Sequence, residues 1–179
     1  MDGEGKYTLK ITGRDEEAPQ ALVLFNHFLQ QVARHGLQDL GGRAESKDGL
    51  VHHLYEDTSI VLGQAYRKAF GDKAGISRVS YLKWPFERCV GEMAVDLSGR
   101  GGDPDFETEI RDSKLSEMAY HVILSLSRES GIDIYARTSG WSDHHQLELL
   151  GKLLGRNVYN ATRRLESYTE PLSTKGTLG

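Results

Sequence analysis

Two segments of the chain place an apolar residue at every third or fourth position, which is the spacing of one helix face. They span residues 19–35 and residues 114–130. Gly36 and Gly131 follow these segments directly, and glycine commonly caps a helix C-terminus because it tolerates left-handed backbone angles. The pattern therefore predicts two amphipathic helices, each ended by a glycine.

Two further helices are predicted to begin at pairs of adjacent histidines. One opens at His52 and keeps its apolar periodicity to Phe70, and the other opens at His144. Alternating apolar and polar positions predict strands, with a turn at residues 139–140. The predicted strands are residues 7–11, 76–82, 92–97 and 132–136. Helices and strands mixed without strict alternation predict an α+β fold with helices layered on a β-sheet.

Six of the seven histidines form two groups with the same internal order. Each group has one histidine in the middle of an amphipathic helix and a His-His-x-x-Glu motif that opens the next helix. His121 follows His27 by 94 residues (121 − 27), and His144 follows His52 by 92 residues (144 − 52). We therefore predict an internal duplication within one domain. Its pseudo-symmetric halves are expected at about residues 1–90 and 91–168, followed by a C-terminal tail at residues 169–179.

Each His-His-x-x-Glu motif offers two metal ligands on one helix face. Residues four apart on a helix lie one above the other, whereas neighbouring residues diverge by about 100°. His52 and Glu56 can therefore hold one ion, and so can His144 and Glu148. The second histidine of each motif points away from this face, toward a second ion. With the two mid-helix histidines, the motifs supply six imidazoles and two carboxylates, enough for two ions with four protein ligands each.

A single motif of this kind is more often a solvated helix start, and a single mid-helix histidine is more often packed or hydrogen-bonded. Two copies of the whole arrangement at matching spacing favour metal binding instead. Imidazole suits zinc, iron, nickel or copper, whereas carboxylates and open water positions also admit manganese. The lack of cysteine ligands argues against a closed structural zinc site. The residues alone therefore predict a metal centre without fixing the metal.

The composition excludes several other classes of protein. Of 179 residues, 38% are hydrophobic and 27% charged, the balance of a soluble globular protein. A net charge of −4 argues against a nucleic-acid partner, which needs a surplus of Lys and Arg. The apolar runs are too short to span a membrane. With one cysteine and no secretory pattern at the N-terminus, the sequence predicts a cytoplasmic protein.

Six groups of residues, in this order along the chain, resemble the imidazoleglycerol-phosphate dehydratase family. They are NHFLQQVARHG at residues 26–36, HHLYED at 52–57 with LGQA at 62–65, GDKAGISR at 71–78, DLSGR at 96–100, DHHQLE at 143–148 and STKG at 173–176. The resemblance implies a manganese enzyme of histidine biosynthesis. Such an enzyme removes water from imidazole glycerol phosphate to give imidazole acetol phosphate.

The resemblance also implies two manganese ions (Mn²⁺) per chain and a homo-oligomer of twenty-four chains, with metal sites at the subunit interfaces. One ion is expected to bind His27, His53, His144 and Glu148. The other is expected to bind His52, Glu56, His121 and His145. Each ion then combines the two-residue motif of one half with two single imidazoles of the other, in agreement with the helix geometry.

A second set of residues is expected to contact the substrate, mostly through its phosphate. Guanidinium and ammonium groups bind phosphate through charge-assisted hydrogen bonds. By the resemblance, this set is His35, Arg78, Arg100, Lys152, Ser173, Thr174 and Lys175. For His35, a cationic side chain near a helix C-terminus is an equally good explanation. Each Arg or Lys, taken singly, is more typical of a solvated surface.

The reaction explains why two ions are needed, because the proton to be removed is not next to a carbonyl. A cation at the imidazole nitrogens of the substrate acts as a Lewis acid, and a general acid assists the departing hydroxyl. Glu56 and Glu148 are expected to be ligands, so the acid–base group is expected to be a metal-bound water or a nearby carboxylate. A dinuclear hydrolase is disfavoured, because the spacing offers no carboxylate that bridges the ions.

The chain departs from the family pattern at several positions. The family begins with a strand whose glutamate contacts the substrate, and this chain starts after that strand, with Glu16 and Glu17 as candidate replacements. Asn26 and Val51 stand where the family has acidic residues, and PFER at residues 85–88 replaces Pro-Met-Asp-Glu. All eight metal positions are intact. Two alternatives therefore stay open: a family member with a different substrate, and a non-catalytic, metal-assembled particle.

Overall fold

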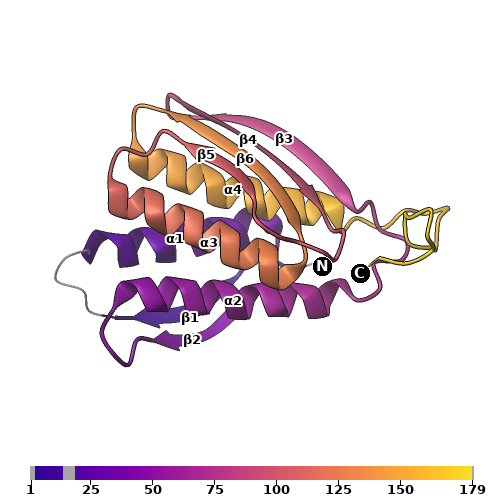
Figure 1. Cartoon of the computed structure of the whole chain (residues 1–179), viewed down its shortest axis with the longest axis horizontal. Coiled ribbons are helices and arrows are strands. Elements are labelled where there is room, and N and C mark those ends of the chain that lie inside the picture. Colours follow the sequence, from indigo (N-terminus) through magenta and orange to yellow (C-terminus); the bar gives the residue numbers. More distant parts are fainter. Residues whose placement is uncertain (1–2, 14–18, 179) are drawn as a thin grey trace.

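The computed structural model describes residues 3–13 and 19–178 (Figure 1). Its helices are α1 (Pro19–Gly36), α2 (Val51–Phe70), α3 (Ser113–Ser130) and α4 (Asp143–Ala161). Its strands are β1 (Tyr7–Thr12), β2 (Leu40–Glu45), β3 (Val79–Phe86), β4 (Cys89–Asp96), β5 (Asp105–Thr108) and β6 (Asp133–Gly140). Glu16 and Glu17 lie outside the described residues.

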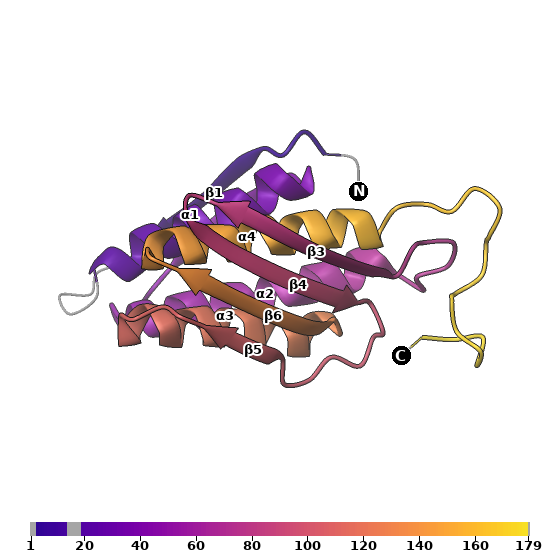
Figure 2. The same cartoon turned by 90° about the horizontal axis from the view of Figure 1, so that it is seen from above.

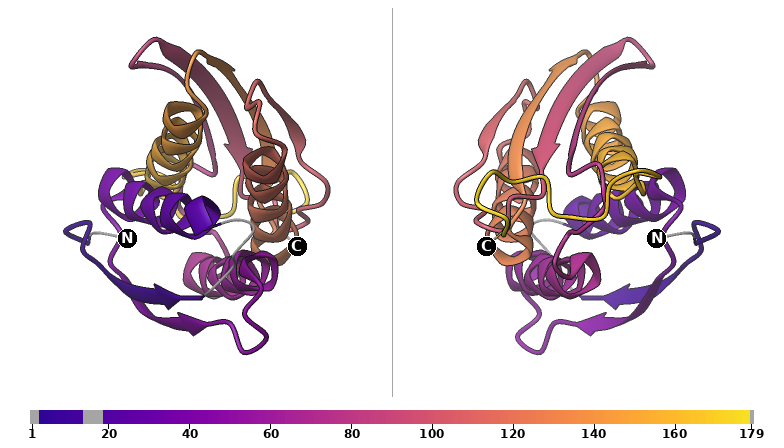
Figure 3. Two further views of the ribbon diagram at one scale, coloured as in Figure 1. Left: turned by 90° about the vertical axis from the view of Figure 1, so that its left-hand side faces the viewer. Right: turned by 90° about the vertical axis from the view of Figure 1, so that its right-hand side faces the viewer.

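The helices lie between two sheets, as the end-on views show (Figure 3). The larger sheet has the strand order β3-β4-β6-β5; β5 runs parallel to β6, and the other neighbours are antiparallel. This sheet extends over α3 and α4 (Figure 2). β1 and β2 form a parallel pair on the opposite side. The order β5–α3–β6–α4 thus repeats the order β1–α1–β2–α2.

The helices pack in two pairs, and each pair combines one helix from each repeat. α1 packs on α4, and α2 packs on α3. A side chain on Gly155 in α4 would collide with the Val32 carbonyl of α1, and a side chain on Gly63 in α2 would meet Cβ of Glu129 in α3 at 2.7 Å. Gly63 and Gly155 are 92 residues apart (155 − 63), the same offset as the paired histidines. Glycine at both places allows both close contacts.

The sequence prediction of an α+β fold is confirmed, and one of its two predicted glycine caps is not. Gly131 follows α3 with φ 74°, a left-handed cap whose N–H donates to the Ser127 carbonyl. Gly36 is instead the last residue of α1, and Leu37 after it has φ 48°. A side chain on Gly36 would collide with the Gln38 side chain and lie 3.0 Å from the Gly155 carbonyl oxygen. The small size of Gly36 therefore serves the α1–α4 contact rather than a cap.

The predicted strands are present with shifted ends, and β2 and β5 were not predicted. β3 begins at Val79, because Ile76 forms an isolated β-bridge with Arg164, which follows α4. β6 continues through the turn predicted at residues 139–140, because these residues pair with β4. β2 contains two glycines and β5 is short, so neither segment shows the residue pattern that predicts a strand. The strands before α2 belong to the two-stranded sheet, and the strands from Val79 onward belong to the four-stranded sheet.

Within the described ranges, 3–13 and 19–178, every helix is too short or too polar to cross a membrane.

Candidate metal centre

The first group of candidate ligands lies where α1 packs on the beginning of α4. The Ser142 hydroxyl caps α4 by accepting from the His145 N–H, so His144 and Glu148 come one helical turn apart. Nε2 of His27 and Nε2 of His144 lie 3.4 and 3.6 Å from Oε2 of Glu148. The possible ligand atoms of these three residues all lie within 4.8 Å of one another. We call His27, His144 and Glu148 the α1–α4 cluster.

The surroundings of this cluster favour the metal-binding forms of its side chains. Burial would raise the pKa of Glu148, but the hydrogen bond and charge of Lys152, together with His27, lower it below its usual value. Nζ of Lys152 is 3.1 Å from Oε1 of Glu148 and lies over the Phe86 ring. Burial and the neighbouring His27 lower the pKa of His144. An ionised carboxylate and a neutral imidazole are the forms that bind a metal.

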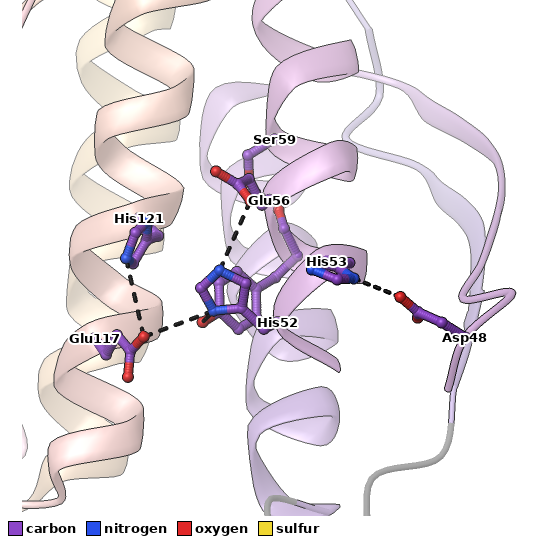
Figure 4. A network of polar contacts seen from close by, with 8 residues as sticks. Asp48, His52, His53, Glu56, Ser59, Glu117 and His121 are labelled. Atoms are coloured by element: carbon purple, nitrogen blue, oxygen red, sulfur yellow. Dashed lines mark hydrogen bonds and ion pairs between the residues drawn. The ribbon is translucent and has the colours of Figure 1, made fainter. Parts of the chain in front are cut away.

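The second group lies where α2 faces α3 (Figure 4). Nε2 of His52 is 3.7 Å from Oε2 of Glu56, and the ring centroids of His52 and His121 are 5.0 Å apart. The Tyr55 hydroxyl lies 2.7 Å from Nδ1 of His52. Because Tyr55 occupies Nδ1, Nε2 of His52 is the nitrogen that faces Glu56. We call His52, Glu56 and His121 the α2–α3 cluster.

His53 points away from the α2–α3 cluster, toward the loop before α2 (Figure 4). Its Nδ1 lies 2.5 Å from Oδ2 of Asp48, and 53% of its side chain is exposed. The hydrogen bond to Asp48 raises the pKa of His53, and hydrogen bonds from Ser46, His53 and the Leu50 N–H lower the pKa of Asp48. Since Asp48 binds Nδ1, the nitrogen of His53 that remains for a metal is Nε2.

His145 also lies apart from the α2–α3 cluster that the sequence assigned to it. It sits at the start of α4, and its ring packs against Trp141 and Phe86 with centroids 5.9 and 5.4 Å away. Its Nδ1 is buried and has no hydrogen-bond partner among the described residues, which is an unfavourable state for a polar atom. Within the described chain, each cluster therefore holds three of its four predicted ligands.

Most of the predicted substrate-binding residues lie at the other end of the helices. The Arg78 N–H donates to the carbonyl of Ala161, the last residue of α4, whereas His144 is near its first residue. A helix of that length rises about 25 Å. The Leu97 N–H donates to the Arg78 carbonyl, so the loop with Arg100 starts beside Arg78. The C-terminal segment, drawn in yellow, lies at this end as well (Figure 1).

The loop at residues 71–78 holds the C-terminal segment in place. Ala74 bridges to Pro171, and the Arg78 guanidinium donates to the carbonyl of Leu172. The same guanidinium donates to both carboxylate oxygens of Asp96, at 2.6 and 2.7 Å, and these bonds raise the pKa of Arg78. The structure thus brings Arg78 next to the segment with Ser173, Thr174 and Lys175.

Lys152 and His35 are the members of the substrate set that lie elsewhere. Lys152 contacts Glu148 of the α1–α4 cluster. His35, in the last turn of α1, packs edge-on against Trp84 with ring centroids 5.4 Å apart. Burial lowers the pKa of His35, and the positive charges of Lys152 and Arg156 lower it further. The neutral ring is therefore the favoured form, so a cationic role at the helix end is disfavoured for His35.

Three polar residues beside the candidate ligands were not predicted from the sequence. Oε1 of Glu117 lies 3.6 Å from Nδ1 of His52 and 4.0 Å from Nε2 of His121. Nε2 of Gln31 lies 3.3 Å from Nε2 of His27. Both residues are four positions from a mid-helix histidine, a spacing that could have identified them. Asp48 lies in a loop, where helical spacing gives no comparable signal.

The donor atoms of both clusters fit a divalent cation. Each cluster offers two imidazoles and one carboxylate from helices that pack together. In the α1–α4 cluster the possible ligand atoms already lie within 4.8 Å of one another, whereas the α2–α3 cluster shows a 3.7 Å His52–Glu56 contact and ring centroids 5.0 Å apart. This mixed nitrogen and oxygen set suits zinc and manganese among other metals. Three protein ligands leave the coordination sphere open for a further ligand, water or substrate.

Comparisons with known proteins identify the family of the chain. The family model described as imidazoleglycerol-phosphate dehydratase matches residues 21–158. The chain is 37% identical to an imidazoleglycerol-phosphate dehydratase of Clostridium botulinum, over 98% of this chain and 88% of that protein. It is 35% identical to the enzyme of that name from Haloarcula marismortui, over 99% of this chain and 89% of that protein.

Solved structures show the same fold. The crystal structure of the Pyrococcus furiosus dehydratase superposes with a TM-score of 0.76 at 25% identity, covering 97% of this chain and 91% of that chain. The Staphylococcus aureus dehydratase superposes with a TM-score of 0.72 at 20% identity, covering 92% of this chain and 91% of that chain. With the family match over most of its length, the chain belongs to the imidazoleglycerol-phosphate dehydratase family, the hydro-lyases of histidine biosynthesis.

Proposed function

We propose that this chain dehydrates imidazole glycerol phosphate to imidazole acetol phosphate, in the cytoplasm, with two Mn²⁺ ions per chain. The observation that carries the proposal is the convergence of two imidazoles and one carboxylate in the α1–α4 cluster. The α2–α3 cluster brings together the same residue types at the facing sides of two packed helices. The substrate follows from the family, whose members carry its name. When bound, manganese supplies Lewis acidity at the imidazole nitrogens of the substrate.

We propose that a neighbouring subunit supplies the fourth protein ligand of each ion. His53 of a second chain would join the α1–α4 cluster, and His145 of a second chain would join the α2–α3 cluster. Both histidines lie outside the clusters of their own chain, and Nδ1 of His145 is buried without a partner in the part of the chain that the structure describes. The active form is then a homo-oligomer, as in the twenty-four-chain particle that the family resemblance implies.

The substrate phosphate is proposed to bind Arg78, Arg100, Ser173, Thr174 and Lys175 of a chain other than the one that holds the metal. A substrate made of one five-membered ring, three carbons and a phosphate is roughly 10 Å long. It cannot span the helix length of about 25 Å that separates these residues from the clusters of the same chain. Lys152 contacts Glu148 of the α1–α4 cluster, and His35 is near enough to Lys152 for that charge to lower the His35 pKa. Both are proposed to contact the substrate from that side.

Reconstitution with metal tests the proposed reaction. Protein stripped of metal is incubated with imidazole glycerol phosphate, with and without Mn²⁺, and mass spectrometry follows the loss of one water molecule. We expect product only with Mn²⁺, and none from the Glu148→Gln variant. Protein that binds Mn²⁺ and leaves the substrate unchanged would contradict the proposed reaction. That result would favour a non-catalytic particle or a different substrate.

A further inference from the structure

The repeat allows the two clusters to be compared position by position. His27 of the α1–α4 cluster corresponds to His121 of the α2–α3 cluster, and the motif ending in Glu148 corresponds to the motif ending in Glu56. The three candidate ligands therefore match in type. The residues one helical turn away from them do not match, and that difference concerns charge.

The first difference lies one turn before the mid-helix histidine. Glu117 precedes His121 by four residues, and its carboxylate lies between His52 and His121, at 3.6 and 4.0 Å from their ring nitrogens (Figure 4). The corresponding residue four positions before His27 is Val23, whose side chain is 66% exposed. The α2–α3 cluster thus has a second carboxylate where the α1–α4 cluster has an alkyl group.

The second difference lies one turn after the glutamate of each motif. Lys152 follows Glu148 by four residues, and its buried ammonium is 3.1 Å from the Glu148 carboxylate. The residue four positions after Glu56 is Ile60, which carries no charge. The carboxylate of the α1–α4 cluster is therefore neutralised by a contacting lysine. In the α2–α3 cluster, two carboxylates face the same imidazole from its two nitrogens.

We infer that Glu117 is a functional part of the second metal site and makes the two sites of each chain unequal. The α2–α3 site binds a divalent cation first and more tightly, and the α1–α4 site fills second. This inference rests on the proposed metal binding and deepens it. Oε1 of Glu117 is 4.0 Å from Nε2 of His121, so an ion bound to that nitrogen lies within about 6 Å of the carboxylate. A carboxylate about 6 Å from a doubly charged ion is worth roughly tenfold in affinity even at the dielectric constant of water. The Lys152 ammonium opposes the ion at the other site.

Mn²⁺ affinity, measured by electron paramagnetic resonance of the free ion, tests this inference without reference to activity. Two variants isolate the sites: His27→Ala removes a ligand from the α1–α4 site, and His121→Ala removes its counterpart from the α2–α3 site. We expect the His27→Ala protein to bind its remaining Mn²⁺ at least about tenfold more tightly than the His121→Ala protein. Adding Glu117→Gln to His27→Ala should abolish most of that advantage.

Two further variants make the test specific. Val23→Glu, added to His121→Ala, places a carboxylate at the corresponding position of the weaker site and should raise its Mn²⁺ affinity. Glu166→Gln, at an exposed position in the segment after α4, makes the same change in net charge as Glu117→Gln and should leave both affinities unchanged. Circular dichroism verifies that each variant is folded.

Equal affinities in the two single-site proteins, or an affinity that does not respond to Glu117→Gln, would overturn the inference while leaving the proposed metal binding intact. Wild-type protein that binds no Mn²⁺ would overturn both. A tighter α2–α3 site that weakens with Glu117→Gln and stays unchanged with Glu166→Gln supports it.

Discussion

At the scale of single residues, the neighbours of each candidate ligand decide which nitrogen or oxygen is available. Asp48 binds Nδ1 of His53, so Nε2 of that ring remains. Tyr55 contacts Nδ1 of His52 in the same way. Lys152 lowers the pKa of Glu148 and keeps it ionised. Such contacts fix the orientation and protonation state of a ligand before the metal arrives.

His35 provides a prediction at this scale. Its pKa is lowered in the folded chain, so the unfolded chain takes up a proton first as the pH falls below 6.5. The unfolded state then binds more protons, and stability is lost as the pH decreases. Urea unfolding of metal-free protein between about pH 7.5 and about pH 5.5 should show a smaller loss for His35→Gln than for wild type. Lys68→Gln, at an exposed position, is the control and should lose as much stability as wild type. If His35→Gln also loses as much as wild type, the lowered pKa of His35 is contradicted.

At the scale of elements, the crossed helix pairs position both clusters. α1 supplies one histidine to a motif on α4, and α3 supplies one histidine to a motif on α2. The close approach of α1 and α4 depends on the glycines at their contact, which place two helix backbones against each other.

Substitution of Gly155 tests this dependence. Its missing side chain leaves room for the carbonyl of Val32, so Gly155→Ala must push the helices apart. We expect a loss of about 1–3 kcal/mol in the free energy of unfolding and weaker Mn²⁺ binding at the α1–α4 cluster. Gln30→Ala, at an exposed position on α1, should change stability by less than about 0.5 kcal/mol. Equal unfolding midpoints for the two variants would show that the contact is not tight.

The elements also show what the sequence could predict. Helical periodicity and the matched histidine spacing identified all four helices and the His–Glu pair of each motif, because i and i+4 positions share a face. The family resemblance, not the spacing, assigned His27 and His121 to their clusters. Spacing along the chain carries no information on which helices pack together, so it could not show that His53 and His145 lie outside the clusters. β2 was missed because Gly41 and Gly42 are typical of turns, and Asp48 because its contact depends on a loop.

At the scale of the whole molecule, assembly should depend on the ligands that lie outside the clusters. If His53 and His145 reach ions held by neighbouring chains, then His53→Ala and His145→Ala should each give smaller particles by light scattering, with unchanged circular dichroism. Chelation of the metal should have the same effect on wild type, because ligands that meet only in the assembly couple metal binding to association. Full-size particles in metal-free buffer would refute this coupling.

The opposite placement of the clusters and the phosphate-binding set also belongs to this scale. Truncation after Glu170 removes Ser173, Thr174 and Lys175 and leaves the helices intact. A charge-assisted hydrogen bond to phosphate contributes roughly 1.5–3 kcal/mol. The truncated chain should therefore bind Mn²⁺ and assemble normally while kcat/KM falls by at least about tenfold.

The most direct test of a shared active site is the mixing of two defective chains. Chains carrying Glu148→Gln lack one metal ligand but keep the C-terminal segment, and chains truncated after Glu170 have the reverse defect. Each protein is dissociated by chelation, and the two are reassembled with Mn²⁺ separately and together. We predict that the mixed particles dehydrate imidazole glycerol phosphate faster than the sum of the two separate samples. A mixed sample no more active than that sum would contradict an active site built from two chains.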